Sequence, residues 1–308
     1  MKQSLFHAKV LLFGEYGILE NSSGLSIPHN SYQGTLKFQS TSSKEFSYSN
    51  LELKKYYKFL LKKKRKNLVS LDLYKLHEDI QKGIFFHSNI PQGYGIGSSG
   101  ALVAAIYEKY ATNKLKKCVI KKEQKHIISL KRTFSQMESF FHGKSSGIDP
   151  LICYLNIPLL IRSKTNISTI KIPFLKGRGA IFLLDSGIPR TSSMINFFLK
   201  KLNHDKFKKI LKEEFFKYNE KCIEAFLKKD FQVLLKHVKS LSAWGFHHFR
   251  PIIPEKFCKI WEEGLFTNIH YLKLCGFGGG GFMLVFTPDY DLSKEKLKQY
   301  TTEVLFRF

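Results

Sequence analysis

The sequence is poor in cysteine, tryptophan, acidic residues and long apolar runs, and each shortage excludes a class of protein. Its 308 residues include five cysteines and two tryptophans. The cysteines are widely spaced and never form a C-x-x-C pair, so we expect neither a disulfide framework nor a zinc site, and we expect a reducing compartment. No run approaches the roughly 18 apolar residues of a membrane span, and polar residues interrupt the N-terminus too early for a signal-peptide core. We therefore expect a cytoplasmic protein with no membrane partner.

Acidic residues are scarce beside basic ones. Asp and Glu total 25 against 50 Lys and Arg, a net charge of +25. Such an excess raises the question of a nucleic acid, an anionic membrane or an anionic small molecule. The positive charge is, however, spread evenly along the chain, with a net charge of +13 over residues 1–150 and +12 over residues 151–308. Only seven of the basic residues are arginine. Protein surfaces that recognise nucleic-acid bases favour arginine, because its guanidinium group can make two parallel hydrogen bonds to a base. A drift toward AT-rich codons therefore explains the charge best, and we expect no specific nucleic-acid partner.

Hydrophobic periodicity indicates an α+β protein in two lobes. We expect strands at 10–13, 24–28, 32–40, 83–91, 180–184, 271–274 and 282–286, helices at 51–67, 101–111 and 121–141, and a helix-rich stretch over 192–246. A weak boundary near residues 176–179 divides the chain into domains 1–176 and 177–308. The basic run at residues 62–66 is either a nucleic-acid or localisation patch or the solvated end of a helix, and the helix end is favoured because cations suit a helix C-terminus.

The most informative segment reads P-Q-G-Y-G-I-G-S-S-G-A over residues 91–101, between an expected strand and an expected helix. Gly93, Gly95 and Gly97 free the backbone for positive φ, and the N–H groups of the following helix point into the loop. This combination is typical of a phosphate site. The segment is neither a Walker A loop nor a dinucleotide fingerprint. A purely structural turn is the alternative, but Ser98 and Ser99 add hydroxyls suited to a phosphate oxygen or Mg²⁺.

Three further segments carry polar or flexible residues that could serve chemistry. Residues 138–150 read E-S-F-F-H-G-K-S-S-G-I-D-P. Glu138 with a serine hydroxyl would suit Mg²⁺, whereas Asp149 before a proline is also typical of a helix N-cap. Lys9 precedes an apolar strand and is one of 43 lysines. Residues 276–281 hold five glycines in six positions, which favours the close passage of a ligand or of another backbone.

These four segments, in this order, resemble the GHMP superfamily of small-molecule kinases, which includes galactokinases and homoserine, mevalonate and phosphomevalonate kinases. The loop resembles the family's P-x-G-x-G-L-G-S-S-A-A, with Gly100 in place of alanine. The other segments resemble K-V-I-L-F-G-E-H-A-V from residue 9, E-x-x-x-H-G-N-P-S-G-V-D from residue 138 and K-L-T-G-A-G-G-G-G from residue 273. Tyr16, Cys275 and Phe277 depart from these patterns. The resemblance spans residues 6 to about 286, and the motif that begins at Glu138 is most like that of mevalonate kinases.

The resemblance implies a fold and a set of site residues. It implies an N-terminal lobe like domain 2 of ribosomal protein S5 and a ferredoxin-like C-terminal lobe, with the active site between them. Asp149 would be the catalytic base, Lys9 would lie beside the acceptor hydroxyl, and Ser99 and Glu138 would ligate Mg²⁺. The ATP phosphates would be bound by Gly93, Gly95, Gly97, Ser98, Ser99 and Gly100. The acceptor side would comprise Lys9, Glu15, Tyr16, Asp149, Ser192, Gly278 and Gly279.

The function that the resemblance implies is ATP-dependent phosphorylation of the primary hydroxyl of mevalonate, a step in the synthesis of isoprenoid precursors. The alternatives are another kinase of the superfamily, chiefly one acting on phosphomevalonate, or an inactive paralogue that binds nucleotide or RNA. A diphosphomevalonate decarboxylase is disfavoured by Glu138. The expected partners are ATP and mevalonate or a related small anionic alcohol, and assembly as a homodimer is left open.

Overall fold

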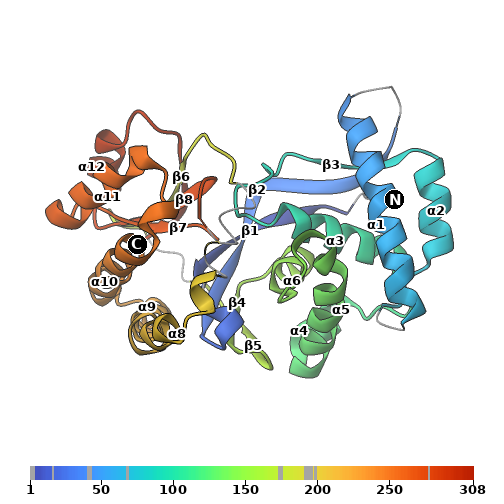
Figure 1. The fold of residues 1–308 in the computed structure, drawn as a ribbon, viewed down its shortest axis with the longest axis horizontal. Helices are drawn as coiled ribbons and strands as arrows, with labels where there is room; N and C mark the ends of the chain where they lie inside the picture. The colour runs from blue at the N-terminus through green and yellow to red at the C-terminus, as the bar shows by residue number, and fades with distance from the viewer. Residues whose placement is uncertain are drawn as a thin grey trace.

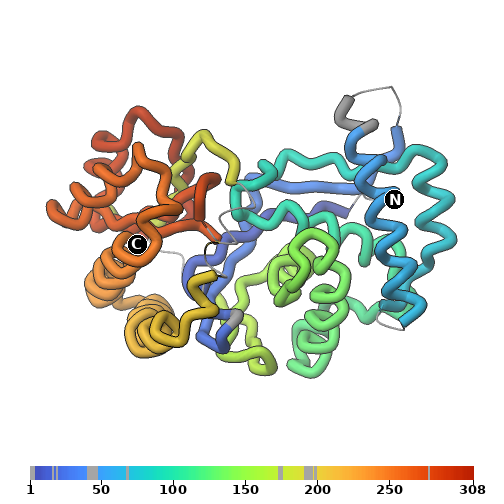
Figure 2. Tube along the Cα trace, viewed as in Figure 1, coloured from blue at the N-terminus to red at the C-terminus, as the bar shows by residue number. Residues whose placement is uncertain are grey.

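The protein is a two-lobed α+β structure with one antiparallel sheet in each lobe (Figure 1). The computed structural model describes residues 4–15, 17–39, 44–66, 69–172, 176–190, 197, 200–276 and 278–308. In Figure 2 the blue-to-green part of the chain and the orange-to-red part lie at opposite ends of the molecule. No helix within these residues is both long and apolar enough to span a bilayer. All five cysteines are free thiols, as their spacing predicts.

The N-terminal sheet is built around one long strand. Its members are β1 (Phe6–Phe13), β2 (Gly24–Phe38), β3 (Ile84–Ser88), β4 (Leu159–Ser163) and β5 (Asn166–Thr169). β2 pairs with β1 on one side and with β4 and then β3 on the other. The two strands expected at 24–28 and 32–40 are therefore a single strand. The register of the pairing shifts between His7, which lies opposite Gln33, and Ala8, which lies opposite His29. Residues 30–32 of β2 are skipped there, and the pairing with β1 continues on both sides of them.

Helices cover the N-terminal sheet and bring distant segments of the sequence together in space. They are α1 (Lys44–Arg65), α2 (Leu73–Gln81), α3 (Ser98–Tyr110), α4 (Lys117–Lys122), α5 (Gln124–His142) and α6 (Ile148–Leu155). A short 3₁₀ turn, η1 (Ile18–Glu20), follows β1. α3 and α6 pack on β1 and β2 and against each other. The basic run forms the last turn of α1, as predicted, and Lys63 donates to Gln136 of α5 at 3.0 Å.

The C-terminal sheet confirms the ferredoxin-like lobe. Its strands are β6 (Ala180–Asp185), β7 (Tyr271–Leu274), β8 (Phe282–Thr287) and β9 (Thr302–Arg307). Its helical elements are α8 (Asp205–Ile210), the π-helical turn η2 (Leu211–Phe215), α9 (Phe216–Lys228), α10 (Phe231–Phe249), the 3₁₀ turn η3 (Arg250–Ile252), α11 (Glu255–Thr267) and α12 (Tyr290–Lys296). The spatial order β7-β8-β6-β9 places the four strands in the order second, third, first, fourth. With helices between the first and second strands and between the third and fourth, this is the β-α-β-β-α-β arrangement.

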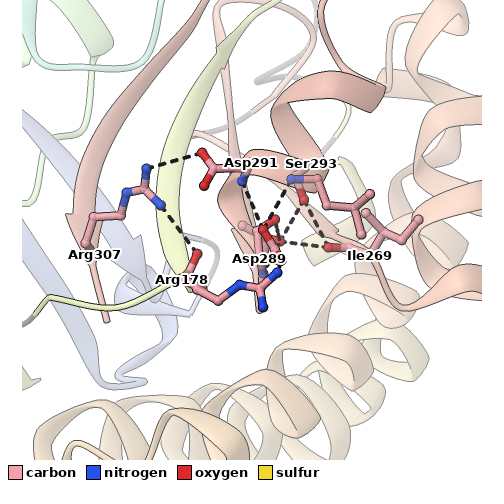
Figure 3. Close-up of polar contacts among 8 residues, drawn as sticks. Arg178, Ile269, Asp289, Asp291, Ser293 and Arg307 are labelled. Carbon is pink, nitrogen blue, oxygen red and sulfur yellow. Dashed lines mark hydrogen bonds and ion pairs between the residues drawn. The ribbon is translucent and has the colours of Figure 1, made fainter.

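The start of α12 contacts both the segment that precedes β6 and the edge strand β9 (Figure 3). Asp289 caps α12 by accepting from the N–H groups of Asp291 and Leu292, and it pairs with Arg178. Arg307 on β9 lies 3.8 Å from Asp291 and donates to the carbonyl of Arg178 at 3.4 Å. Residue 178 thus packs with the C-terminal lobe, and the domain boundary near residue 176 stays a prediction.

The two lobes meet along α9 and the end of β1. Asn219 on α9 is fully buried and donates to the Ser23 carbonyl at 2.8 Å and to the Ser22 hydroxyl at 3.2 Å. Phe13 of β1 packs against Phe226 of α9 and Phe286 of β8. A single hydrophobic cluster therefore runs through both lobes, which fixes the segments that face each other across the junction.

Candidate active site

The glycine-rich loop leads directly into the N-terminus of α3. Gly93, Gly95 and Gly97 have φ of +79°, +81° and +86°, as their spacing predicts. Gly97 is the N-cap, so Ser98 and Ser99 are the first two residues of the helix. The N–H groups of the first helical turn and the positive end of the helix dipole consequently face the loop, an arrangement that suits an anion.

Lys9 on β1 lies beneath this loop and pairs with Asp149 from α6. The Lys9 Nζ lies 2.9 Å from Asp149 Oδ2 and donates to the Gly95 carbonyl at 3.2 Å. The Lys9 side chain is 4% exposed and that of Asp149 is 36% exposed, so the carboxylate is open to a ligand while the ammonium is not. Burial opposes the positive charge of Lys9, but the Asp149 carboxylate and other neighbouring groups outweigh it, and the pKa of Lys9 lies above its ordinary value.

The position of Asp149 differs from that of a helix N-cap. α6 begins at Ile148 and its N-cap is Gly147, at φ +75°. A Cβ on Gly147 would lie 2.2 Å from the Lys131 carbonyl oxygen, so α5 leaves room only for glycine there. The N-cap interpretation of Asp149 is therefore wrong. Asp149 lies in the first turn of α6, where it is free to pair with Lys9.

Beside this pair, Glu138 on α5 and Ser99 on α3 meet. The Ser99 hydroxyl lies 3.3 Å from Glu138 Oε1 and 3.0 Å from His142 Nε2, and the Ser145 hydroxyl donates to Glu138 Oε2. Burial, aided by the Asp149 charge, raises the pKa of Glu138 to about 8, although the two hydroxyls and Lys9 act in the opposite direction. Burial likewise lowers the pKa of His142.

The donors at this point fit Mg²⁺. A buried carboxylate whose pKa is raised is one that a nearby cation would stabilise, and Ser99 supplies a second hard oxygen. Among the described residues no group of three acidic, histidine or cysteine side chains is placed to hold a metal. That is compatible with Mg²⁺, which takes one or two protein oxygens and completes its shell with water and phosphate.

The glycine run at Gly276 and Gly278 to Gly281 packs backbone to backbone against the glycine-rich loop that precedes α3, called the phosphate loop below. A Cβ on Gly281 would lie 2.5 Å from the Tyr94 Cα, and one on Gly95 would lie 2.8 Å from the Cys275 carbonyl oxygen. The glycines therefore allow another backbone segment to pass close by. The number of glycines in this run predicts the close passage of either a ligand or another backbone. Gly278 and Gly279 lie in this run at φ of +77° and +82°.

The remaining residues that the sequence suggested for the site are buried in packing contacts or lie outside the residues that the structure describes. The carboxylate of Glu15 is not open to a ligand, because its side chain is 2% exposed and pairs with Lys273 of β7 at 2.7 Å. Tyr16, Ser192 and Phe277 are outside the described residues. Gly100 packs against the start of α6, and a Cβ there would lie 2.9 Å from the carbonyl carbon of Asp149.

Arg190 and His142 are site residues that the sequence interpretation did not select. Arg190 follows Pro189 in the I-P-R turn. Its N–H donates to the Gly93 carbonyl at 3.1 Å, and its Nη1 would lie 3.2 Å from a Cβ on Gly276. Burial lowers the pKa of His142 and the Arg190 charge adds to that effect, whereas burial raises the pKa of the Cys275 thiol and the Arg190 charge opposes the rise. Arg190 could have been chosen over Ser192 because it is one of only seven arginines and the only cation in that turn.

The comparisons with known proteins agree with this arrangement. Residues 54–156 match the family model for the GHMP kinases N terminal domain, a span that contains the phosphate loop, Glu138 and Asp149. A search of curated proteins finds no match to the sequence.

Solved structures of GHMP kinases match nearly the whole chain. Mevalonate kinase of L. major in complex with R-mevalonate is 16% identical, with a TM-score of 0.61 over 97% of this chain and 90% of that chain. Streptococcus pneumoniae phosphomevalonate kinase in complex with phosphomevalonate and AMPPNP is 13% identical, with a TM-score of 0.63 over 99% of both chains. Lactococcus lactis galactokinase complexed with galactose is 12% identical, with a TM-score of 0.64 over 97% of this chain and 92% of that chain.

Residues 54–156 match the N-terminal domain of the GHMP kinases, and both lobes together have the GHMP kinase fold. The TM-scores are nearly equal for kinases named for three different acceptors. The likeness in fold therefore does not distinguish among these acceptors.

Proposed function

We propose that this protein is an ATP-dependent kinase that phosphorylates the primary hydroxyl of mevalonate. The observation that carries the proposal is the Lys9–Asp149 pair, at 2.9 Å, beneath a glycine loop that opens onto the N-terminus of α3. Phosphoryl transfer needs alignment and charge neutralisation more than covalent chemistry. The loop, the helix and the ammonium supply these, and the partly exposed carboxylate supplies a base.

Each residue has a distinct part in the proposed reaction. Asp149 would accept the proton of the acceptor hydroxyl, while Lys9 holds the carboxylate in place and offsets negative charge around the transferred group. The loop glycines, Ser98 and Gly100 would hold the phosphates through backbone N–H groups. Ser99 and Glu138 would hold Mg²⁺, which when bound offsets charge on the phosphate oxygens.

An anionic acceptor suits the charges around the site. Arg190 adds a guanidinium beside the loop, close to Gly276 and His142. A neutral sugar gains little from a second cation, whereas a carboxylate or phosphate on the acceptor, or the phosphates of ATP, would be stabilised by it. Mevalonate and phosphomevalonate both meet this requirement, so the second candidate is a phosphomevalonate kinase. The five free thiols suit the cytoplasm in which either reaction would run.

The acceptor is tested by measuring ADP release with four compounds. Mevalonate, phosphomevalonate, galactose and homoserine are each supplied with Mg·ATP, and the phosphorylated product is confirmed by mass spectrometry. We expect turnover with mevalonate at a kcat/KM at least about tenfold above that for any other compound. Preference for phosphomevalonate would favour the second candidate. ATP binding without turnover, together with tight and salt-resistant RNA binding in a mobility-shift experiment, would favour the inactive paralogue.

A further inference from the structure

Glu15 and Lys273 form an ion pair that joins the two lobes inside the protein. Glu15 follows the end of β1, and Lys273 lies on β7 of the C-terminal sheet. Lys273 Nζ is 2.7 Å from Glu15 Oε2, and the two side chains are 5% and 2% exposed. Lys273 also donates to the carbonyl of Leu274 at 3.3 Å. A pair so fully withdrawn from water is costly to form and is kept only where both charges remain partnered.

The surroundings of the pair are aromatic. It borders a small cavity whose other lining residues are Phe215, Leu241, Trp244, Gly245, Phe249, Trp261 and Leu274. Phe215 comes from η2, the π-helical turn between α8 and α9, and both tryptophans of the chain face this cavity. A charge left alone here would have no solvent to stabilise it, so Glu15 and Lys273 constrain each other's positions strongly.

The pair also closes a ring of contacts that passes through Lys9. From Glu15 the ring follows β1 back to Lys9, which donates to the Gly95 carbonyl at 3.2 Å. Gly95 in turn packs on the Cys275 carbonyl, which a Cβ on Gly95 would approach to 2.8 Å. Cys275 is two residues from Lys273, which returns to Glu15. Every link is a direct contact or a few residues of backbone.

We propose that Glu15 and Lys273 are positioning residues that hold the C-terminal glycine run and the phosphate loop in register with Lys9 and Asp149. Glu15 acts through Lys273 and does not touch the acceptor, in contrast to the acceptor contact that the family resemblance implies for it. The inference rests on the proposed kinase function, because its main readout is turnover.

The test is a double-mutant cycle of Glu15→Gln, Lys273→Met and the two together. A small displacement of the reactive groups should lower kcat by about 10- to 100-fold while the KM for the acceptor changes by less than about threefold. Because each residue acts through the other, the double variant should be no slower than the slower single variant. A tenfold or larger rise in acceptor KM with kcat unchanged, or effects that multiply in the double variant, would overturn the proposal.

Controls separate positioning from loss of stability. Lys109→Met breaks another ion pair, with Asp79 at 3.0 Å, that lies away from the loop. It should lower the melting temperature and leave kcat within about twofold. If a single variant fails to fold, the double variant decides, because it buries no unpaired charge. All kinetics are measured well below each melting temperature.

The failure of the proposed function would be visible separately. If the wild-type protein turns over none of the four acceptors, the kinase proposal fails. The positioning role of the ion pair is then tested by measuring the affinity for Mg·ATP with calorimetry. Glu15→Gln, Lys273→Met and the double variant should then each weaken Mg·ATP binding by about threefold or more, to the same extent. Unchanged Mg·ATP affinity in all three would refute the positioning role.

Discussion

The surroundings of Asp149 are set by residues that are distant in the chain. Its carboxylate is held at 2.9 Å from Lys9, which is itself buried, and its side chain remains 36% exposed. Gly147 at φ +75° starts the helix and leaves Asp149 free of a capping role. A carboxylate that is held on one side and open on the other is suited to take a proton from a bound hydroxyl.

Asp149→Asn should therefore lower kcat for acceptor phosphorylation by about 100- to 10,000-fold, because the amide cannot accept the proton. The fold should survive with a loss of about 1–3 kcal/mol, since the partly exposed amide oxygen of the new side chain can still accept from Lys9. Steady-state kinetics and thermal unfolding by circular dichroism measure the two effects. Asp79→Asn, which alters the carboxylate that pairs with Lys109, serves as the control. A kcat within tenfold of wild type would refute the role of Asp149 as the base.

At the scale of elements, the contact between α3 and α6 sets the distance between the glycine-rich loop and Asp149. Gly100 lies where these helices touch, and a Cβ there would come within 2.9 Å of both the Asp149 carbonyl carbon and the Pro150 nitrogen. The family pattern that this loop resembles has alanine at the position, so this protein packs the two helices more closely than that pattern implies.

Gly100→Ala should push α3 and α6 apart and displace Asp149 from Lys9. We expect kcat to fall by at least about tenfold and the free energy of unfolding to fall by about 1–3 kcal/mol, despite the higher helix propensity of alanine. Gly245→Ala in α10 is the matched control, because a Cβ at Gly245 has its nearest neighbour at 3.9 Å. That variant should be more stable by about 0.5–1 kcal/mol. An active and stabilised Gly100→Ala protein would show that the helices can separate without consequence.

At the scale of the whole molecule, buried histidines link stability to pH in both lobes. His29 on β2 is 6% exposed and faces Glu303 of β9 at 3.1 Å, and His270 ahead of β7 is 3% exposed. Burial lowers the pKa of both, against the pull of Glu303 on His29 and of the Ile260 carbonyl on His270. Below about pH 6.5 the unfolded chain therefore takes up protons that the folded protein does not.

Stability should fall as the pH drops from about 7 to 5.5, with each histidine contributing at most about 1.4 kcal/mol per pH unit between its unfolded and folded pKa. Denaturant unfolding at several pH values, compared between wild type and a His29→Gln/His270→Gln variant, measures this contribution. Glu138 acts in the opposite sense, because its pKa is raised to about 8, and it cancels in the comparison. Parallel pH profiles for the two proteins would refute the prediction.

The net charge of +25 is also a property of the whole molecule. Under the proposed function, this excess would attract ATP and an anionic acceptor from a distance, and salt would screen that attraction. Raising the ionic strength from about 0.05 to about 0.3 M should raise the KM values by about threefold with little change in kcat. KM values that do not respond to salt would show that the excess has no steering role.

The sequence by itself determined many of the local conformations and the resemblance to the GHMP kinases. Alternating glycines can be interpreted as positive-φ positions because only glycine adopts that backbone freely, and the spacing from Glu138 to Asp149 carries the GHMP resemblance. Continuous apolar runs located β1 and β8, whose residues are almost all buried, and helix-like stretches located α3 and α5. The even distribution of charge along the chain likewise argued against a nucleic-acid partner from the residues alone.

Only the tertiary structure decided which charged groups meet. It paired Lys9, one of 43 lysines, with Asp149, and it placed Glu15 against Lys273 in the interior. It brought Arg190 and His142 to the site, and it showed that Asp149 is not a cap. Such pairings join residues far apart in the chain and depend on how two sheets and their helices pack. The spacing of residues along the sequence indicates which side chains are neighbours on one helix or strand. It does not indicate which side chains meet across the junction between two lobes.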